Sequence, residues 1–339
     1  MKLALSLLAL SLPAANGFAF VAPSSTLHHS STCLGASKST AKKLKREKWA
    51  EARGVAAAPS SSAGPSTQKN EGGLEYVTLA GPTGSTSTVY TLGACVTSYV
   101  DGGTEFLKVR PDAKMDGSKP ISGGLAFCWP QFGPDSGLEG LSLQQHGFAR
   151  NVDWSVSSLS GDSVTMTLEP NDYTKGMWDK DFSCSYTVTV ADGSLDTEFK
   201  VKNNGAEAFS QQAALHSYFD VSSLENLSIE GGFKGKTYID KMDGGSEKTE
   251  ERDALTITAE TDSVYLGVSD PSIVDSGKGK KVSVVTESGW EDCVVWNPHG
   301  DEGMGYDTFV CAESVKFKPV SVEAGGEWVG KMKLVPSDL

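Results

Sequence analysis

The stretch YTVTVADGSLDTEFKVKNNG, residues 186–205, decides the fold because it joins two alternating segments through a turn. Apolar residues stand at every second position from Tyr186 to Val190, and a second series at strand spacing runs from Leu195 to Val201. Side chains of a strand point alternately to its two faces, so each segment has one apolar and one polar face. The Asp-Gly pair between them tolerates positive φ. The stretch therefore predicts an antiparallel β-hairpin.

The same alternation continues on both sides of this hairpin. Apolar residues alternate with threonines over residues 164–168, and a similar pair of segments surrounds the turn at residues 324–326. Helical periodicity is hardly visible after Leu74, whereas turn residues recur at short intervals. The sequence therefore predicts an all-β domain over residues 71–339, a large antiparallel β-sandwich rather than a parallel α/β sheet.

The first seventy residues do not follow the strand pattern. A charged residue, an apolar run and then small residues are typical of a secretory signal peptide over residues 1–17. Residues 18–70 are rich in Ser and Thr and basic at 38–53, which predicts a transit peptide and a disordered linker. With Phe18 directly after the expected cleavage site, the segment resembles the bipartite presequence of algal secondary plastids. We expect plastid localisation; the alternative is a secreted protein with a basic propeptide.

The remainder of the chain is strongly acidic. The protein holds 30 Lys and Arg and 43 Asp and Glu, of which the first 70 residues hold 9 and 2, so residues 71–339 carry a net charge of −20. This charge argues against nucleic acid or an anionic membrane as a partner, and no apolar run is long enough to span a bilayer. A small anionic ligand would need a local basic pocket.

The cysteine pattern indicates free thiols. An odd number of Cys remains after residue 70, with no C-x-x-C spacing, which suits neither a disulfide framework nor a zinc site. We therefore expect no metal. These residues are Cys95, Cys128, Cys184, Cys293 and Cys311.

Four segments place polar or ionisable residues in apolar surroundings. They are GGLAFCWPQFGP (123–134) with QHGFAR (145–150), AALHSYF (213–219), TDSVY (261–265), and VVWNP (294–298) with FVCAE (309–313). Together and in this order, they resemble the glucose-6-phosphate 1-epimerase branch of the aldose 1-epimerase family from about Leu74 to Val335. The resemblance implies a galactose mutarotase-like supersandwich. It also implies an isomerase that interconverts the α and β anomers of a hexose 6-phosphate, with glucose 6-phosphate as the expected substrate.

Anomer interconversion needs one base, one acid and no cofactor. The base takes the proton of the C1 hydroxyl while the ring oxygen gains one, so that the ring opens, and the roles reverse on closure. Glu313 follows the apolar run 309–312, where we expect it to end a strand, and it is the predicted base; His216 is the predicted acid. The alternatives are a strand-end Glu turned to solvent and a hydrogen-bonded core histidine.

Two further residues lie around Gly147 on a segment that we expect to be irregular and to line the same cleft. His146 is predicted to orient the substrate by hydrogen bonding, and Arg150 to hold the phosphate with its planar guanidinium. A structural salt bridge is the alternative for Arg150.

Three more residues are predicted to contact the substrate. Asp262 would bond sugar hydroxyls or else be a strand-edge residue in a turn, and Gln131 belongs to the first motif. Trp296 would stack on the sugar ring, a role equally open to Trp129 and Phe132, although any of the three could be core.

One motif departs from the family pattern. The branch usually has an Arg before the Gly-Gly pair, where it helps to hold the phosphate, and this chain has Ser122. Lys108, Arg110 and Lys114 lie just upstream and could compensate. Two alternatives therefore stay open: an epimerase of unphosphorylated aldoses, and a non-catalytic carbohydrate-binding sandwich. The expected partner is a small-molecule sugar phosphate, and the expected state a monomer.

Overall fold

The computed structural model describes residues 66–134, 138 and 144–339. The predicted signal peptide and nearly all of the predicted transit peptide and linker lie outside these residues. Sheet structure begins at Gln68–Lys69, a strand paired with Glu75–Ala80, just ahead of the predicted domain start at residue 71. Among the described residues, no helix is long and apolar enough to cross a membrane.

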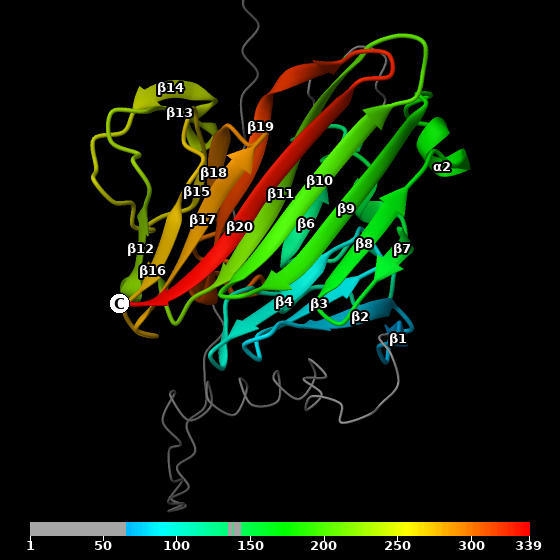
Figure 1. Ribbon diagram of the computed structural model, residues 1–339. Helices are drawn as coiled ribbons and strands as arrows, with labels where there is room; N and C mark the ends of the chain where they lie inside the picture. Colours follow the sequence, from blue (N-terminus) through cyan, green and yellow to red (C-terminus); the bar gives the residue numbers. More distant parts are fainter. Residues whose placement is uncertain (1–65, 135–137, 139–143) are drawn as a thin grey trace, which may run out of the picture. The chain divides into compact units, whose positions relative to one another are not determined.

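A 12-stranded antiparallel sheet forms one layer of the described residues. Strands distant in sequence meet at its centre, because β6, β11 and β19 are neighbours (Figure 1). From edge to edge the strands are β1 (Gln68–Lys69), β2 (Glu75–Ala80), β3 (Thr86–Tyr90), β4 (Val96–Asp101) with β5 (Thr104–Glu105), β6 (Leu125–Cys128), β11 (Phe209–Asp220), β19 (Phe309–Val322), β18 (Asp292–Asn297), β15 (Thr261–Tyr265), β13 (Thr237–Asp240) and β14 (Ser246–Thr249).

An 8-stranded antiparallel sheet forms the second layer of the described residues. Its order is β12 (Leu227–Glu230), β16 (Ser272–Asp275), β17 (Lys280–Ser288), β20 (Glu327–Asp338), β10 (Ser194–Asn203), β9 (Phe182–Ala191), β8 (Ser163–Leu168) and β7 (Ser155–Leu159). Helical structure is limited to short pieces, which are α2 (Asp172–Lys175) and the 3-10 turns η1 (Ala149–Asn151), η2 (Leu224–Asn226), η3 (Lys241–Asp243) and η4 (Tyr306–Thr308).

The predicted hairpin at residues 186–205 is formed by β9 and β10. Leu195 pairs with Val190 and Val201 pairs with Cys184, so the two apolar series lie on the same face of the sheet. Buried positions alternate with partly exposed ones along both strands. Gly193 has φ +76°, as the tight turn requires. The alternation in the sequence therefore predicted both the strands and their pairing.

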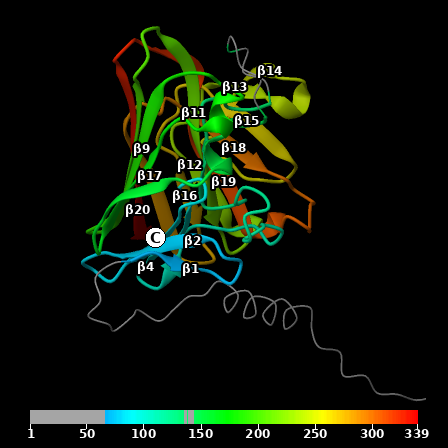
Figure 2. The same cartoon turned by 90° about the vertical axis from the view of Figure 1, so that its right-hand side faces the viewer.

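The two sheets pack face to face through a core of aromatic and branched side chains. The ring of Phe127 in β6 lies 4.6 Å from that of Tyr186 in β9 and 4.6 Å from that of Phe199 in β10. Figure 2 shows β9 and β20 in one layer and β11, β15 and β18 in the other. This arrangement confirms the predicted antiparallel β-sandwich.

The five body cysteines are free and buried, as their number and spacing predicted. Cys184 and Cys293 belong to the main core, Cys95 belongs to a smaller cluster with Tyr90 and Leu92, and Cys128 and Cys311 belong to smaller clusters on the other face of the large sheet. The five are Cys95, Cys128, Cys184, Cys293 and Cys311.

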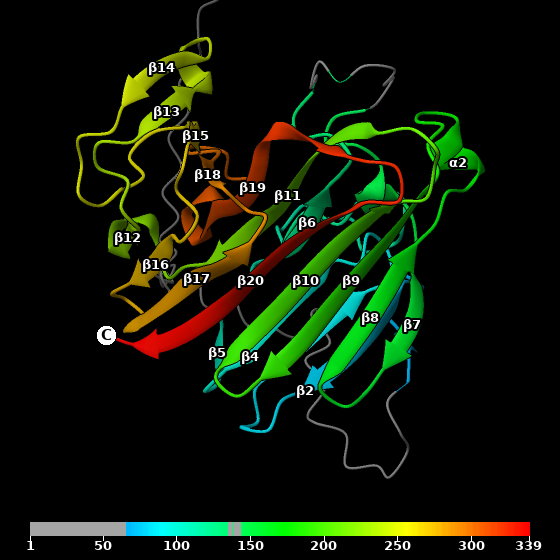
Figure 3. The same ribbon diagram turned by 45° about the horizontal axis from the view of Figure 1, so that its top comes forward.

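The face of the large sheet turned away from the second sheet carries the candidate site. Phe127 is paired with Leu215, and both belong to the core, so the adjacent pair Ala126 and His216 faces the other way. Beyond β15, the β13–β14 hairpin forms the edge of this sheet (Figure 3). The η3 turn joins these two strands, and its contacts with β15 bring it toward the same face.

Candidate active site

His216 and Glu313 lie opposite each other on neighbouring central strands. The pairs Leu215–Ser314 and Tyr218–Cys311 fix the register of β11 against β19 on either side of them. Nδ1 of His216 lies 3.5 Å from Oε1 of Glu313. Strand pairing between residues almost a hundred positions apart thus brings together the two side chains predicted as acid and base.

The two members of this pair differ in exposure. The side chain of Glu313 is 2% exposed and that of His216 is 11% exposed. Oε2 of Glu313 has no hydrogen-bond partner among the described residues. Glu313 lies within β19, which continues to Val322, so the expectation that it ends a strand was wrong. The strand continues because the residues after Glu313 still pair with β11 and β18.

Burial pushes both members of the pair toward their uncharged forms. Burial raises the pKa of Glu313 well above its usual range; Lys241 and Arg150 oppose this rise and Asp262 adds to it. Burial lowers the pKa of His216, and the neighbouring His146, Arg150, Lys241 and Arg110 lower it further. The cations around the pair therefore favour an ionised Glu313.

Aromatic rings form one wall beside His216. The Tyr218 ring is stacked on the imidazole, with centroids 4.6 Å apart and planes at 10°. The Trp296 ring meets the imidazole edge-on at 5.7 Å. Trp129 is instead fully buried in the core, where its ring packs against Phe182. The structure thus separates the aromatic candidates: Trp296 lies at the site and Trp129 does not.

The segment around Gly147 is irregular, as predicted, and is bonded directly to the core. Gly147 has φ +70°, and a Cβ at this position would clash with the carbonyl oxygen of Trp129. His146 also has positive φ, +67°. The imidazole centroids of His146 and His216 are 5.8 Å apart. The close backbone approach at Gly147 therefore places His146 beside the predicted acid.

His146 is a neutral hydrogen-bond donor. Its Nδ1 accepts a hydrogen bond of 3.2 Å from the backbone amide of Gly133, so the proton of the neutral ring is on Nε2. Burial, with Arg150 and Lys241 nearby, lowers the pKa of His146 to about 3. An uncharged N–H group at this position suits a sugar oxygen.

Arg150 supplies a positive charge near His146. It lies in η1, where Nη2 donates to the carbonyl oxygen of Gln145 at 3.0 Å. Its Nε is buried and has neither a hydrogen-bond partner nor a carboxylate partner among the described residues. The salt-bridge alternative for Arg150 is therefore not observed in this part of the chain.

Phe132, Asp262 and Gln131 occupy different places around the pair. The Phe132 ring lies 5.5 Å from that of His146. Asp262 lies in β15, and its Oδ1 is 3.0 Å from Nζ of Lys241. Gln131 is buried, and its amide nitrogen donates to the carbonyl oxygens of Gly133 and Pro134. Gln131 thus holds the turn that bonds His146.

The structure adds Arg110 and Lys241 to the site. The backbone amide of Arg110 donates to the carbonyl oxygen of Ser122 at 2.9 Å. Its side chain is 12% exposed, and the guanidinium donates hydrogen bonds to Asp112 and lies within electrostatic reach of Tyr218 and His216. Lys108, Arg110 and Lys114 were the three residues that could compensate for Ser122 in place of the family's Arg. Of these three, Arg110 alone approaches the site.

The other two upstream cations have different environments. Lys108 is 2.6 Å from a carboxylate oxygen of Asp220, and Lys114 is exposed. Lys241 could not be identified as a site residue from the sequence, because it lies outside the four motif segments. It reaches the site only through the pairing of β13 with β15.

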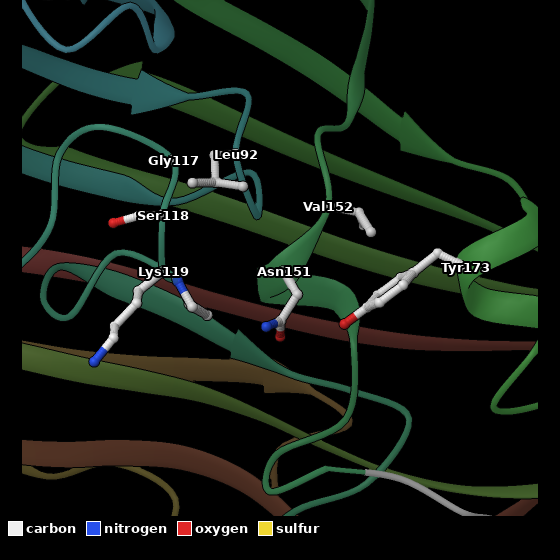
Figure 4. Close-up of a pocket in the computed structure, with 8 residues that line it drawn as sticks. Leu92, Gly117, Ser118, Lys119, Asn151, Val152 and Tyr173 are labelled. Carbon is white, nitrogen blue, oxygen red and sulfur yellow. The ribbon is translucent and has the colours of Figure 1, made fainter.

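A separate hollow lies near the segment that follows Arg150. It is lined by residues that include Leu92, Ser118, Lys119, Asn151 and Tyr173. In Figure 4, Asn151 lies between the loop that carries Lys119 and the side chain of Tyr173. None of the predicted site residues lines this hollow. Within the described residues, no group of three or more His, Cys, Asp or Glu side chains is arranged to hold a metal ion.

Comparison with known proteins assigns the family. The family model described as aldose 1-epimerase matches residues 75–334. A protein of Cenchrus ciliaris named "Putative glucose-6-phosphate 1-epimerase" is 33% identical over 294 residues, which cover 79% of this chain and 87% of the relative. A protein of Escherichia coli K12 with the same name is 31% identical over 235 residues, 66% of this chain and 76% of the relative.

A solved structure supports the same fold. The structure of a protein from Salmonella typhimurium, titled a "putative mutarotase", superposes with a TM-score of 0.72 at 24% sequence identity. The match covers 87% of this chain and all of that one. The chain therefore belongs to the aldose 1-epimerase family, and it is an isomerase of the epimerase type with a galactose mutarotase-like fold.

Proposed function

We propose that this protein interconverts the α and β anomers of a hexose 6-phosphate, with glucose 6-phosphate as the substrate. The observation that carries the proposal is the facing pair of His216 and Glu313, 3.5 Å apart on the outer face of the large sheet. The names of the relatives from Cenchrus ciliaris and Escherichia coli support the choice of sugar phosphate.

The pair would act as one base and one acid. Glu313 takes the proton of the C1 hydroxyl while His216 gives one to the ring oxygen, so the C1–ring oxygen bond breaks and C1 becomes an aldehyde. After rotation about the C1–C2 bond, the ring oxygen attacks the other face of C1, and both protons return. The reaction is balanced without an electron acceptor. His146 would donate its Nε2–H to a sugar oxygen, and Trp296 would cover the ring.

Three cations support an anionic substrate. Arg110, Arg150 and Lys241 all lower the pKa of His216, so all three lie within electrostatic reach of it. This concentration of positive charge stands out in a body with a net charge of −20. C6, which carries the phosphate, is attached to C5, the carbon bonded to the ring oxygen, so the phosphate would lie on the His216 side of the sugar. Arg150 and Arg110 would hold it by charge-assisted hydrogen bonds.

A coupled anomerisation assay tests the proposal directly. The purified protein should accelerate mutarotation of glucose 6-phosphate far more than that of glucose or galactose. Equal or greater acceleration with the free sugars would establish the alternative, an aldose 1-epimerase of unphosphorylated hexoses. Binding of sugars without any acceleration would establish the non-catalytic carbohydrate-binding alternative.

The same assay tests the expectation that no cofactor takes part. Proton transfer between oxygen atoms needs only the acid and the base, so activity should survive dialysis against a chelator. Loss of activity that a divalent cation restores would contradict this expectation.

We also propose that the protein acts in a plastid as a monomer on a small-molecule sugar phosphate. Residues 1–70 combine signal-peptide and transit-peptide features, which supports plastid import. Secretion is the alternative destination. Light scattering of the protein without residues 1–70 would measure the mass in solution, and a mass of two or more chains would exclude the monomer.

A further inference from the structure

Lys241 reaches the site from the edge of the sheet, outside every motif. It begins the η3 turn between β13 and β14, and its ammonium lies 3.0 Å from Oδ1 of Asp262. The same ammonium lies 5.0 Å from the centre of the Phe132 ring. Two side chains from different parts of the chain, an anion and an aromatic face, thus hold this cation at the rim of the site.

Glu313 needs such a cation. It is 2% exposed, and its Oε2 has no hydrogen-bond partner among the described residues. A buried carboxylate is costly unless an opposite charge lies near it. The groups that act on it or respond to its charge come from every neighbouring element: His216 and Tyr218 of β11, Asp262 of β15, Lys241 of η3, Arg150 of η1, Cys128 of β6, Cys293 of β18 and Cys311 of β19.

Only three of these groups bring a charge that does not depend on the pair itself. Burial raises the pKa of the three thiols and of the Tyr218 hydroxyl, so they stay uncharged near neutral pH. The charges that act on Glu313 are therefore those of Lys241, Arg150 and Asp262. Because Asp262 opposes ionisation, its effect must be offset by Lys241 and Arg150.

Lys241 and Arg150 do not act alike. Of the two, Lys241 has the larger lowering effect on the pKa of Glu313, whereas Arg150 has the larger lowering effect on that of His216. A positive charge near the pair favours the ionised carboxylate and also the neutral imidazole. At Glu313, the assigned base, Lys241 therefore acts in the direction that the assignment requires.

We propose that Lys241 is a positioning residue of the active site, which fixes Asp262 at the rim and supplies a positive charge that favours the ionised form of Glu313, the assigned base. This role of Lys241 in catalysis rests on the proposed function. The β13–β14 hairpin then contributes to the active site and does not merely extend the edge of the sheet.

The first test is the pH profile of kcat/KM for glucose 6-phosphate in three variants. Lys241→Met keeps the aliphatic stem over Phe132 and removes the charge, so the acidic limb should move up by about one pH unit. Lys241→Arg should leave the limb in place. Lys248→Met is the matched control, because Lys248 lies on the same hairpin and pairs with Asp240 and Asp243 instead. An unmoved limb in Lys241→Met, with wild-type thermal unfolding, overturns the proposal.

A second measurement needs no substrate. The infrared carbonyl band of a protonated buried carboxyl, identified by its absence in Glu313→Gln, reports the titration of Glu313 directly. Its midpoint should be higher in Lys241→Met than in the wild type and unchanged in Lys248→Met. If the wild type has no epimerase activity but this shift occurs, the proposed function fails and the electrostatic role of Lys241 stands. If the wild type is active and no shift occurs, the proposal for Lys241 fails alone.

Discussion

His216 and Glu313 are cross-strand neighbours, with Nδ1 of the imidazole 3.5 Å from Oε1 of the carboxylate, and the side chain of His216 is 11% exposed whereas that of Glu313 is 2% exposed. His146 and Asp262 lie at the same site, but neither takes the place of His216 or Glu313 in the facing pair, so we expect both members of the pair to be necessary.

Glu313→Gln and His216→Ala should each lower kcat by at least about 10²-fold, since positioned proton transfer typically contributes ~10² to 10⁴. The fold should survive, because both residues lie on the outer face and outside the main core. Stopped-flow polarimetry measures the rate, and circular dichroism checks folding. Near-normal turnover in either folded variant would remove that residue from the mechanism.

Arg150→Ala should lower kcat/KM for glucose 6-phosphate by about 10- to 150-fold, the equivalent of 1.5 to 3 kcal/mol of charge-assisted hydrogen bonding. Activity on free glucose should hardly change, because that sugar has no anionic group at C6. Lys in place of Arg should restore only part of the loss, since a point charge lacks the bidentate geometry.

Arg110→Ala is the companion variant to Arg150→Ala. It should show the same selectivity for the phosphorylated sugar, and by a smaller factor, because Asp112 already engages the Arg110 guanidinium. Equal losses on glucose and on glucose 6-phosphate would mean that these side chains support the cleft, and phosphate recognition would have to be withdrawn.

His146 should make the stability of the protein depend on pH. Its pKa is lowered from 6.5 to about 3 in the folded state, so below pH 6.5 the unfolded chain binds a proton that the folded one does not. Its contribution is therefore present above pH 6.5 and is lost as the pH falls toward 3.

His146→Gln should remove this contribution. Between those limits, the free energy of unfolding should fall less steeply in the variant, by up to about 1.4 kcal/mol per pH unit. Urea unfolding across this range measures the slope. His216 is present in both proteins, and His146 lowers its pKa, so the difference measures His146 together with its effect on His216. Identical slopes would show that His146 is accessible to protons in the folded state.

A fluorescent fusion of residues 1–70 should enter the plastid of an alga with a secondary plastid. Phe18→Ala should divert it to the secretory route, because the aromatic residue after the signal peptide is the feature on which plastid sorting is predicted to depend. Confocal microscopy with a plastid marker gives the result. Secretion of the unmodified fusion would favour the alternative of an ordinary signal peptide.

The fold was predictable because its signal is local. The alternation in β9 and β10 determines their faces, and the Asp-Gly turn determines their pairing. The motifs also indicated His146, Arg150, Asp262, His216 and Glu313, which the structure brings close together. The assignment of tryptophans was not predictable, because Trp129 and Trp296 both follow apolar runs. Which face each occupies depends on strand position and register, which only the structure gives.

Lys241 and Arg110 could not be assigned for a different reason. Lys241 approaches Asp262 only because β13 pairs with β15, and this long-range pairing has no counterpart in the order of the motifs. Arg110 was one of three basic residues in one loop, and the sequence offered no means of choosing among them.

The backbone approach at Gly147 has a consequence for the energetics of binding. The amides of Phe148 and Ala149 both donate to the carbonyl oxygen of Trp129, so the segment that carries His146 and Arg150 is bonded to the aromatic core on its inner side. A sugar that binds here meets a surface whose conformational entropy was already lost when the chain folded. Little of the free energy of the contacts between protein and sugar is then lost to ordering this segment. A small, highly hydrated ligand can therefore be bound with few contacts.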